Sequence, residues 1–316
     1  MNSLKVTKPL FGVRTCATSA NLGPGYDIAA LALDIYNEYR VYSGSPGRCS
    51  IGFSGPYASV LDKEKSGSRK LIIRAIDSTI EKFPERIKKP SGKIPIDIEV
   101  IASIPPGKGL GSSASAAVAG ILIANKTYGL DLNKRQLFQT AVELESSPDN
   151  AAAALSGGLA IVYRKKEELL FEKIGLSSGY RILLMIPPSE IDTDTARRLI
   201  PEKVPIGDAV ENISNFSLLV KCLEEENLDD ALVFIRDNLH QKYRKDVYAG
   251  SIGLVEDLIE NWKTPAAISG SGPAVIAIMD QDRFDEYKNN RGAITGKYPG
   301  FQSIITGISA GGSYYI

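Results

Sequence analysis

The chain has little sulfur and almost no imidazole. Its three cysteines, Cys16, Cys49 and Cys222, lie far apart, are odd in number and form no C-x-x-C pair, which argues against a disulfide framework and a thiolate metal site. His240 is the single histidine, so a metal site built from several imidazoles is excluded. Any acid, base or metal chemistry must therefore use carboxylates, amides and lysines.

Net charge and long apolar runs are also missing. The 316 residues carry 37 basic and 37 acidic side chains, which argues against a nucleic-acid or anionic-membrane partner held by bulk electrostatics. The longest nearly apolar stretch, at 114–124, is too short to span a bilayer, and the N-terminus lacks the apolar run of a signal peptide. We therefore expect a cytoplasmic protein, with no nucleic-acid or membrane partner, that acts on a small molecule.

The most informative feature present is a glycine-rich segment at residues 105–115. Alternating apolar and acidic residues at 94–104 predict a half-buried strand before it, and residues 112–128 with Gly129 past their end predict a glycine-capped helix. The first N–H groups of a helix are unpaired and carry about half a positive charge, so they bind an anion. The segment, called the glycine loop below, therefore predicts a phosphate site.

Two better-known phosphate loops fit this segment less well. A Walker A loop would need Gly and Lys where two serines stand. Gly109, Gly111 and Ala114 match the dinucleotide fingerprint, but that fold needs a fully buried strand before the loop and an acidic strand-end residue about 20 residues later. The preceding strand alternates, and the acid at that distance, Asp131, stands in a turn between two helices. A nicotinamide enzyme is therefore the weaker interpretation.

The pattern of strands and helices predicts an α+β fold. Residues 133–146 predict a helix with Asn133 at the N-cap and Gln136 completing a capping box, and Pro148 ends it. A charged stretch near Lys165 suggests two domains, residues 1–165 and 166–316, each long enough for its own core. In the second, helices would cover one face of a mainly antiparallel sheet. The strands expected there are 180–186, 266–269, 274–279 and 301–308, and the helices are 194–199, 208–225, 228–239 and 251–262.

Three separated segments resemble the signature motifs of the GHMP small-molecule kinases, which include galactokinase and the homoserine, mevalonate and phosphomevalonate kinases. They are the glycine loop, the Ser-Gly-Ser-Gly-Pro turn at 269–273, and Thr-Ser-Ala-Asn-Leu-Gly-Pro-Gly-Tyr-Asp at 18–27. The form of the last segment, with Pro-Asp-Asn at 148–150 and Gly-Gly at 157–158, is similar to the homoserine kinase branch. The resemblance covers most of the chain. It implies a two-domain GHMP kinase fold, with a left-handed βαβ unit in the N-terminal domain and a C-terminal ferredoxin-like α/β sandwich.

The resemblance also implies an activity. It is the ATP- and Mg²⁺-dependent phosphorylation of L-homoserine to O-phospho-L-homoserine in threonine biosynthesis, carried out by a homodimer. One position departs from the family, because members commonly carry a histidine where this chain has Ser147. Three alternatives stay open: another GHMP kinase acting on shikimate, mevalonate or pantoate, a non-catalytic nucleotide-dependent sensor on the same fold, and a nicotinamide oxidoreductase.

By the same resemblance, the glycine loop would hold the ATP phosphates through its backbone N–H groups. Ser112 would offer a hydroxyl to magnesium, and Glu143 resembles the family's magnesium-holding glutamate. Glu145 is the competing candidate for that role. Residues two apart on a helix face different sides, so only one of the two glutamates can point into the cleft. The ATP-binding residues expected are Pro105, Pro106, Gly107, Lys108, Gly109, Leu110, Gly111, Ser112, Ser113 and Ala114.

Asn150 stands where many GHMP kinases carry an aspartate that deprotonates the acceptor hydroxyl. An amide is no base near neutral pH, so Asn150 would orient the hydroxyl for direct attack on the γ-phosphoryl group, which a loose transition state allows. Asp149 as general base is the rival hypothesis. Asn150 is also expected to cap a short helix at 151–155.

Homoserine is a zwitterion with a distal hydroxyl, so its site needs a cationic group for the carboxylate and an acceptor for the ammonium. By resemblance, Asn21 and Asp27 contact the amino end. Arg197, with Thr193 four residues before it, and Arg244 would bind the carboxylate through paired N–H groups. The turn residues Gly270, Ser271 and Gly272 are also expected in the substrate site.

Overall fold

The larger of two β-sheets comes mainly from the first half of the chain. The computed structural model describes residues 8–45, 49–63, 67–88, 94–189 and 193–316. Within these residues the sheet has the strand order β11-β1-β2-β4-β3, and the antiparallel β5–β6 hairpin joins it through β2. Its strands are β1 (Phe11–Asn21), β2 (Gly25–Ser43), β3 (Ser50–Ser54), β4 (Ile96–Ile101), β5 (Leu159–Lys165), β6 (Glu168–Ile174) and β11 (Tyr314–Tyr315).

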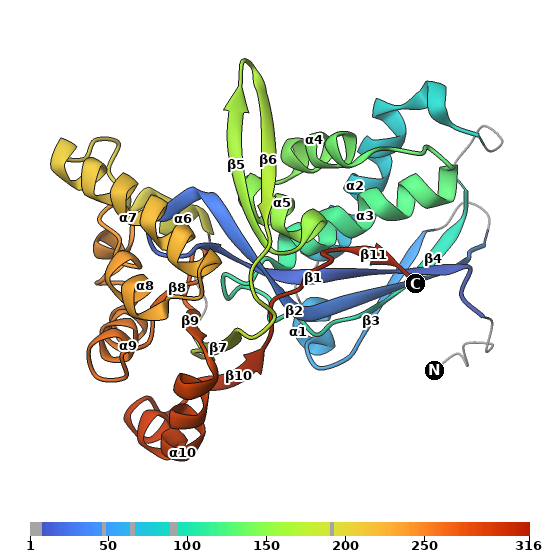
Figure 1. Cartoon of the computed structure of the whole chain (residues 1–316). Helices are drawn as coiled ribbons and strands as arrows, with labels where there is room; N and C mark the ends of the chain where they lie inside the picture. Colours follow the sequence, from blue (N-terminus) through green and yellow to red (C-terminus); the bar gives the residue numbers. More distant parts are fainter. Residues whose placement is uncertain (1–7, 46–48, 64–66, 89–93, 190–192) are drawn as a thin grey trace.

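A parallel pair, β3 and β4, interrupts an otherwise antiparallel arrangement. The chain leaves β3, passes through α1 and α2 and returns into β4, so these elements form a βαβ unit. Figure 1 shows α2, α3, α4 and α5 gathered over one face of the larger sheet. The helices of this half are α1 (Ala58–Lys63), α2 (Gly67–Lys82), the 3₁₀ helix η1 (Pro84–Arg86), α3 (Ser112–Tyr128), α4 (Lys134–Leu144) and α5 (Pro148–Ser156).

The smaller sheet belongs to the second half and is antiparallel throughout, with the strand order β10-β7-β9-β8. Its strands are β7 (Arg181–Ile186), β8 (Ala266–Ile268), β9 (Val275–Met279) and β10 (Gln302–Thr306). The helices of this half are α6 (Thr193–Arg198), α7 (Ile206–Glu224), α8 (Leu228–Phe234), the 3₁₀ helix η2 (Gln241–Arg244), α9 (Ala249–Glu260) and α10 (Gln281–Lys297).

One buried apolar cluster joins the two halves. It packs Leu22 and Leu31, at the β1–β2 end of the larger sheet, with Ile182 of β7 and Leu223 of α7. Separate clusters lie between the larger sheet and its helices and between the smaller sheet, α9 and α10. Because burial of apolar surface is the main stabilising term in folding, the shared cluster fixes how the two sheets sit against each other.

The predicted α+β fold class is confirmed, and so are the helix at 112–128 and its Gly129 cap, which has a φ angle of 65°. The capping box between Asn133 and Gln136 is also present. Residues 165 and 166 lie at the turn of the β5–β6 hairpin, and β6 and β11 beyond it still pair within the larger sheet. The division into residues 1–165 and 166–316 stays a prediction.

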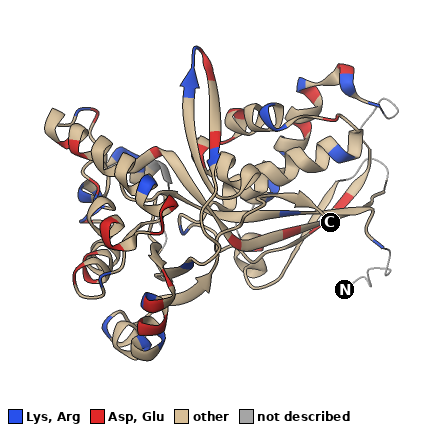
Figure 2. Cartoon of the chain, in the orientation of Figure 1, with Lys and Arg blue, Asp and Glu red and all other residues tan. Residues whose placement is uncertain are grey.

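Basic and acidic residues are mixed along both halves of the chain, as the colouring of Figure 2 shows. This distribution agrees with the balanced count of 37 basic and 37 acidic residues.

Candidate active site

The glycine loop joins β4 to α3 in a backbone conformation that requires glycine. Gly107, Gly109 and Gly111 have φ angles of 65°, 75° and 68°, in the left-handed region. A Cβ at Gly109 would lie 2.1 Å from the carbonyl oxygen of Ser269, and one at Gly111 would lie 1.9 Å from Oγ1 of Thr18. The glycines therefore let the loop pack directly against β1 and the β8–β9 turn.

The first turn of α3 combines backbone donors with a hydroxyl and a carboxylate. Within the described residues no side chain caps this helix, whose N-cap residue is Gly111. Its first N–H groups and its dipole favour an anion at this end. Beside them, Oγ of Ser113 donates a hydrogen bond to Oε1 of Glu145 at 2.5 Å.

A cavity of about 280 Å³ at this helix end brings together segments that are far apart in the sequence. They are the end of β1, the start of β2, the glycine loop, the first turn of α3, the α4–α5 connection, the first turn of α5, α6, η2 and the β8–β9 turn. The lining residues are Ala20, Asn21, Tyr26, Asp27, Gly107, Gly109, Leu110, Gly111, Ser112, Ser113, Ala114, Glu145, Ser146, Ser147, Asp149, Asn150, Arg197, Arg244, Gly270 and Ser271.

Five of the predicted residues whose side chains the structure describes are not in that lining, namely Pro105, Pro106, Lys108, Gly272 and Glu143. Pro105, Pro106 and Lys108 line a separate cavity of about 270 Å³ that includes Tyr57. Nζ of Lys108 donates to the carbonyl oxygens of Pro188 and Ser189, at 2.9 and 2.7 Å, so this lysine ties the glycine loop to the segment after β7.

Gly272 is the fourth, and it supports the β8–β9 turn from behind. Its N–H donates to the carbonyl of Ser269 at 2.8 Å, and a Cβ on it would lie 3.1 Å from the ring of Tyr248. Thr193 begins α6, but its side chain lies outside the part of the chain that the structure describes.

The expectation that Glu143 points into the cleft is wrong. Its side chain is 63% exposed and pairs with Nζ of Lys82 of α2 at 2.6 Å. Glu145, the residue that follows α4, lines the cavity instead. Burial raises the pKa of the Glu145 carboxyl, and the hydrogen bond from Ser113 acts in the opposite direction. The periodicity of a helix says that the two residues face apart, but it does not say which of them faces the site.

An ion pair crosses the cavity between the two halves. Nη2 of Arg197, on α6, lies 3.2 Å from Oδ1 of Asp27, on β2. The same nitrogen donates to the carbonyl oxygen of Ser146 at 2.8 Å. A guanidinium and a carboxylate that both line the cavity offer complementary partners to the two charged ends of a zwitterion.

Asn21, the last residue of β1, fixes the start of β2, which carries Asp27. It adopts a φ angle of 74°, its Nδ2 donates to the carbonyl of Gly270 at 2.9 Å, and its Oδ1 accepts the N–H of Asp27 at 3.1 Å. The side chain therefore joins the adjoining ends of β1 and β2 to the β8–β9 turn.

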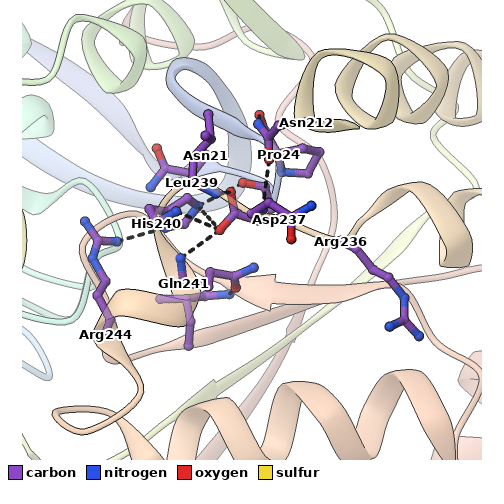
Figure 3. A network of polar contacts seen from close by, with 12 residues as sticks. Asn21, Pro24, Asn212, Arg236, Asp237, Leu239, His240, Gln241 and Arg244 are labelled. Atoms are coloured by element: carbon purple, nitrogen blue, oxygen red, sulfur yellow. Dashed lines mark hydrogen bonds and ion pairs between the residues drawn. The ribbon is translucent and has the colours of Figure 1, made fainter. Parts of the chain in front are cut away.

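Arg244 is 1% exposed, yet it lines the cavity. Its Nη1 donates to Nδ1 of His240 at 3.1 Å and to the carbonyl of Gly270 at 3.0 Å, and its Nε donates to the carbonyl of Ala196 at 3.3 Å. Its guanidinium carbon lies 5.9 Å from the centre of the Tyr26 ring. Figure 3 shows Arg244 pointing its terminal nitrogen at His240.

Asn150 lies in the first turn of α5 and is held from β1. Oγ1 of Thr18 donates to Oδ1 of Asn150 at 2.6 Å, and this same hydroxyl lies against Gly111. The amide oxygen is thereby occupied, and the Nδ2 group is left as the donor. The predicted capping role of Asn150 is wrong, because α5 starts at Pro148, an N-terminal position that proline favours, and its N-cap residue is Ser147.

Asp149 is a buried carboxyl in the cavity wall, 1% exposed. Burial raises its pKa to about 7; Asp27 also raises it, while the N–H of Asn150 and the Arg197 guanidinium lower it. An unpaired buried carboxylate is costly, so this position favours a cationic partner.

Two residues at the site were not assigned roles from the sequence. Thr18 and Tyr26 both lie within the 18–27 motif, which was the only signal available. Thr18 contacts Asn150 and Tyr26 contacts Arg244, which are 132 and 218 residues away in the chain. A local sequence pattern cannot predict contacts between residues so far apart.

The comparisons with known proteins agree with this arrangement. Residues 70–158 match the family model described as the GHMP kinases N terminal domain. The chain is 34% identical over 273 residues to a homoserine kinase of Prochlorococcus marinus, covering 84% of this chain and 83% of the other. It is 34% identical over 281 residues to one of Halothermothrix orenii, covering 88% and 86%.

The chain belongs to the homoserine kinase family of the GHMP kinases. The fold agrees: the crystal structure of a homoserine kinase from Cytophaga hutchinsonii superposes with a TM-score of 0.82 over 100% of both chains, at 21% identity. A GHMP kinase is an ATP-dependent kinase with a small-molecule acceptor, and the oxidoreductase alternative is thereby set aside. None of the described helices of this homoserine kinase family member is both long and apolar enough to cross a bilayer.

Proposed function

We propose that this chain transfers the γ-phosphoryl group of ATP to the hydroxyl of L-homoserine. The observation that carries the proposal is that one cavity holds both an anion-binding helix end and a set of side chains suited to a zwitterion. The first is the start of α3, and the second is Asp27, Asp149, Arg197 and Arg244. The relatives from Prochlorococcus marinus and Halothermothrix orenii are both homoserine kinases, which supports the same acceptor.

The ATP phosphates would lie against the glycine loop and the first turn of α3. Ser112, Ser113 and Glu145 offer oxygen ligands for magnesium at this end, which suits an ion that binds one or two carboxylates together with phosphate oxygens. The described residues contain no cluster of three acidic, histidine or cysteine ligands, so ATP itself would supply much of the coordination. Bound magnesium would neutralise charge on the phosphate oxygens.

The acceptor would lie across the two halves. Its carboxylate would meet the guanidinium groups of Arg197 and Arg244, and its ammonium the carboxylates of Asp27 and Asp149. Its hydroxyl would accept a hydrogen bond from Nδ2 of Asn150, whose oxygen is held by Thr18. In this arrangement Asn150 orients the nucleophile, and the proton passes to the phosphoryl group late in the reaction.

Asp149 as general base stays the competing proposal for the chemical step, since a pKa of about 7 would allow it to accept a proton near neutral pH. A homodimer, a cytoplasmic location and the domain boundary at residue 165 are further proposals that rest on the resemblance and on composition.

The experiment that tests the function is ADP release measured with homoserine, shikimate, mevalonate, pantoate and galactose as acceptors. We expect turnover with homoserine well above that with the other four. Turnover with mevalonate or pantoate and none with homoserine would overturn the substrate and leave the kinase assignment standing. Acceptor-independent ATP binding without turnover would favour a sensor.

A further inference from the structure

The single histidine of the chain lies behind Arg244 with both ring nitrogens occupied. His240 is fully buried, its Nε2 lies 2.9 Å from the carbonyl oxygen of Gly23, and its Nδ1 accepts from Nη1 of Arg244 at 3.1 Å. Its ring stacks on Tyr26, with 5.1 Å between the ring centres. His240 does not line the cavity, whereas its neighbours Tyr26 and Arg244 do.

These contacts allow only one form of the ring. A guanidinium has donors and no acceptor, so Nδ1 must present its lone pair to Arg244, and Nε2 must carry the proton that is donated to Gly23. Burial lowers the pKa of His240; Asp237 raises it, and the Arg244 cation lowers it. The ring is thus a neutral bridge with a donor on one side and an acceptor on the other.

Asp237 holds the segment that carries the ring. Its Oδ2 accepts the N–H groups of His240 and Gln241 at 3.0 and 2.7 Å, and its Oδ1 accepts that of Leu239 at 3.0 Å. Its distance of 3.6 Å to Nε2 of His240 is too long for a hydrogen bond. Asp237 therefore fixes the backbone, as Figure 3 shows, and leaves the ring free to bridge Gly23 and Arg244.

The contacts of Arg244 leave one edge of its guanidinium for the cavity. Nε and Nη1 donate to Ala196, His240 and Gly270, and Nη2 makes no hydrogen bond with any described residue. His240 contributes the one side-chain acceptor in this set. Without it, Nη1 would keep only the Gly270 carbonyl, and the rotation of the guanidinium plane would be less constrained.

We propose that His240 is a positioning residue that holds Arg244 in the orientation that binds the acceptor's carboxylate and ties it to Gly23 of the β1–β2 loop. The inference rests on the proposed function, because it assumes an acceptor with a carboxylate. A positioning role differs from a purely structural one. If the ring were only structural, its loss would lower the stability of the protein without a selective effect on the KM for one substrate.

Two substitutions separate the two contacts of the ring. His240→Gln places an amide near the position of Nε2 and can keep the bond to Gly23, but it leaves Nη1 of Arg244 without its acceptor. His240→Asn places an amide oxygen near the position of Nδ1 and can keep the bond to Arg244, while the bond to Gly23 is lost. The steady-state constants for homoserine and ATP are measured for both variants and the wild type, with thermal melting as a check on folding.

His240→Gln should raise KM for homoserine by about tenfold, as expected for one lost hydrogen bond to a charged group, and leave KM for ATP nearly unchanged. In His240→Asn, KM for homoserine should stay within about threefold of the wild-type value, because the amide oxygen supplies the acceptor for Arg244. With propanolamine, which is homoserine without its carboxylate, His240→Gln should leave kcat/KM close to the wild-type value.

Equal effects of the two variants, equal effects on both substrates, or the same loss with propanolamine would each overturn the proposal. If the wild type phosphorylates a different carboxylate-bearing acceptor, the proposed function fails, and the same comparison made with that acceptor and its decarboxylated analogue decides about His240. An acceptor without a carboxylate would overturn both.

Discussion

At the scale of single residues, the cavity places charged groups where their partners would be parts of a bound molecule. Asp149 is the clearest case. Its carboxyl is buried, burial raises its pKa to about 7, and its Oδ1 accepts a hydrogen bond from the N–H of Asn150. A carboxyl in this position destabilises the folded protein when it ionises.

This cost predicts a pH-dependent effect of Asp149→Asn. The pKa in the folded protein is above the unfolded value of about 4, so the stability contributed by Asp149 is present below pH 4 and is lost as the pH rises to about 7. The substitution should therefore raise the melting temperature of the ligand-free protein at pH 8 and have little effect near pH 4.

Thermal melting of both proteins across this pH range checks the prediction, with the exposed Asp246→Asn as the control. A difference in melting temperature that stays constant from pH 4 to pH 8 would show that the carboxyl of Asp149 is not destabilised by burial.

At the scale of elements, sequence patterns located most of the helices and strands near the site but not all of their ends. The helix at 112–128 and the capping box at Asn133 follow from local rules, since caps and periodicity lie within a few residues. The helix expected at 228–239 ends at Phe234. The N–H groups of Asn238 and Leu239, which would continue it, instead donate to Oδ1 of Asn212 and Oδ1 of Asp237.

Other elements depend on distant partners. The two-residue strand β11 pairs with β1 from the opposite end of the chain, and α10 buries only Tyr287 and Ile294 along its length. Neither gives a strong local pattern. The same reason explains why the sequence could not choose between Glu143 and Glu145, since the choice depends on where α4 meets α2 and α3.

The two glutamates at the end of α4 should differ strongly in their effect on turnover. Glu145→Gln removes the carboxylate proposed to hold magnesium beside Ser113, so kcat should fall on the order of 10²-fold. Glu143→Gln only breaks an exposed ion pair with Lys82, which should leave kcat nearly unchanged.

Steady-state kinetics at saturating ATP and homoserine, repeated over a range of Mg²⁺ concentrations, make this comparison. The reverse ranking would restore Glu143 as the ligand, and no loss in either variant would place the metal elsewhere.

At the scale of the whole molecule, the site exists because two sheets share one buried cluster. The glycine loop, the 18–27 motif and the 148–150 segment come from the first half, and α6, Arg244 and the β8–β9 turn from the second. Family resemblance predicted most of these segments as site residues. Their mutual contacts, such as Thr18 with Asn150 and His240 with Arg244, emerge only once the halves are packed.

We propose that the first half of the molecule holds the phosphoryl donor and that the second half contributes the arginines that bind the carboxylate of a zwitterionic acceptor. Arg197 tests it most directly, because it lies on α6 and pairs with Asp27 across the cavity. The neighbouring Arg198 is exposed, bonds to Oγ1 of Thr195 at 3.0 Å and provides the matched control.

The measurement is KM for homoserine and for ATP in Arg197→Ala and Arg198→Ala. Loss of a charged ligand should raise KM for homoserine by at least about tenfold in Arg197→Ala, with KM for ATP nearly unchanged and Arg198→Ala close to the wild type. An effect confined to ATP, or one of equal size in the two variants, would contradict the account.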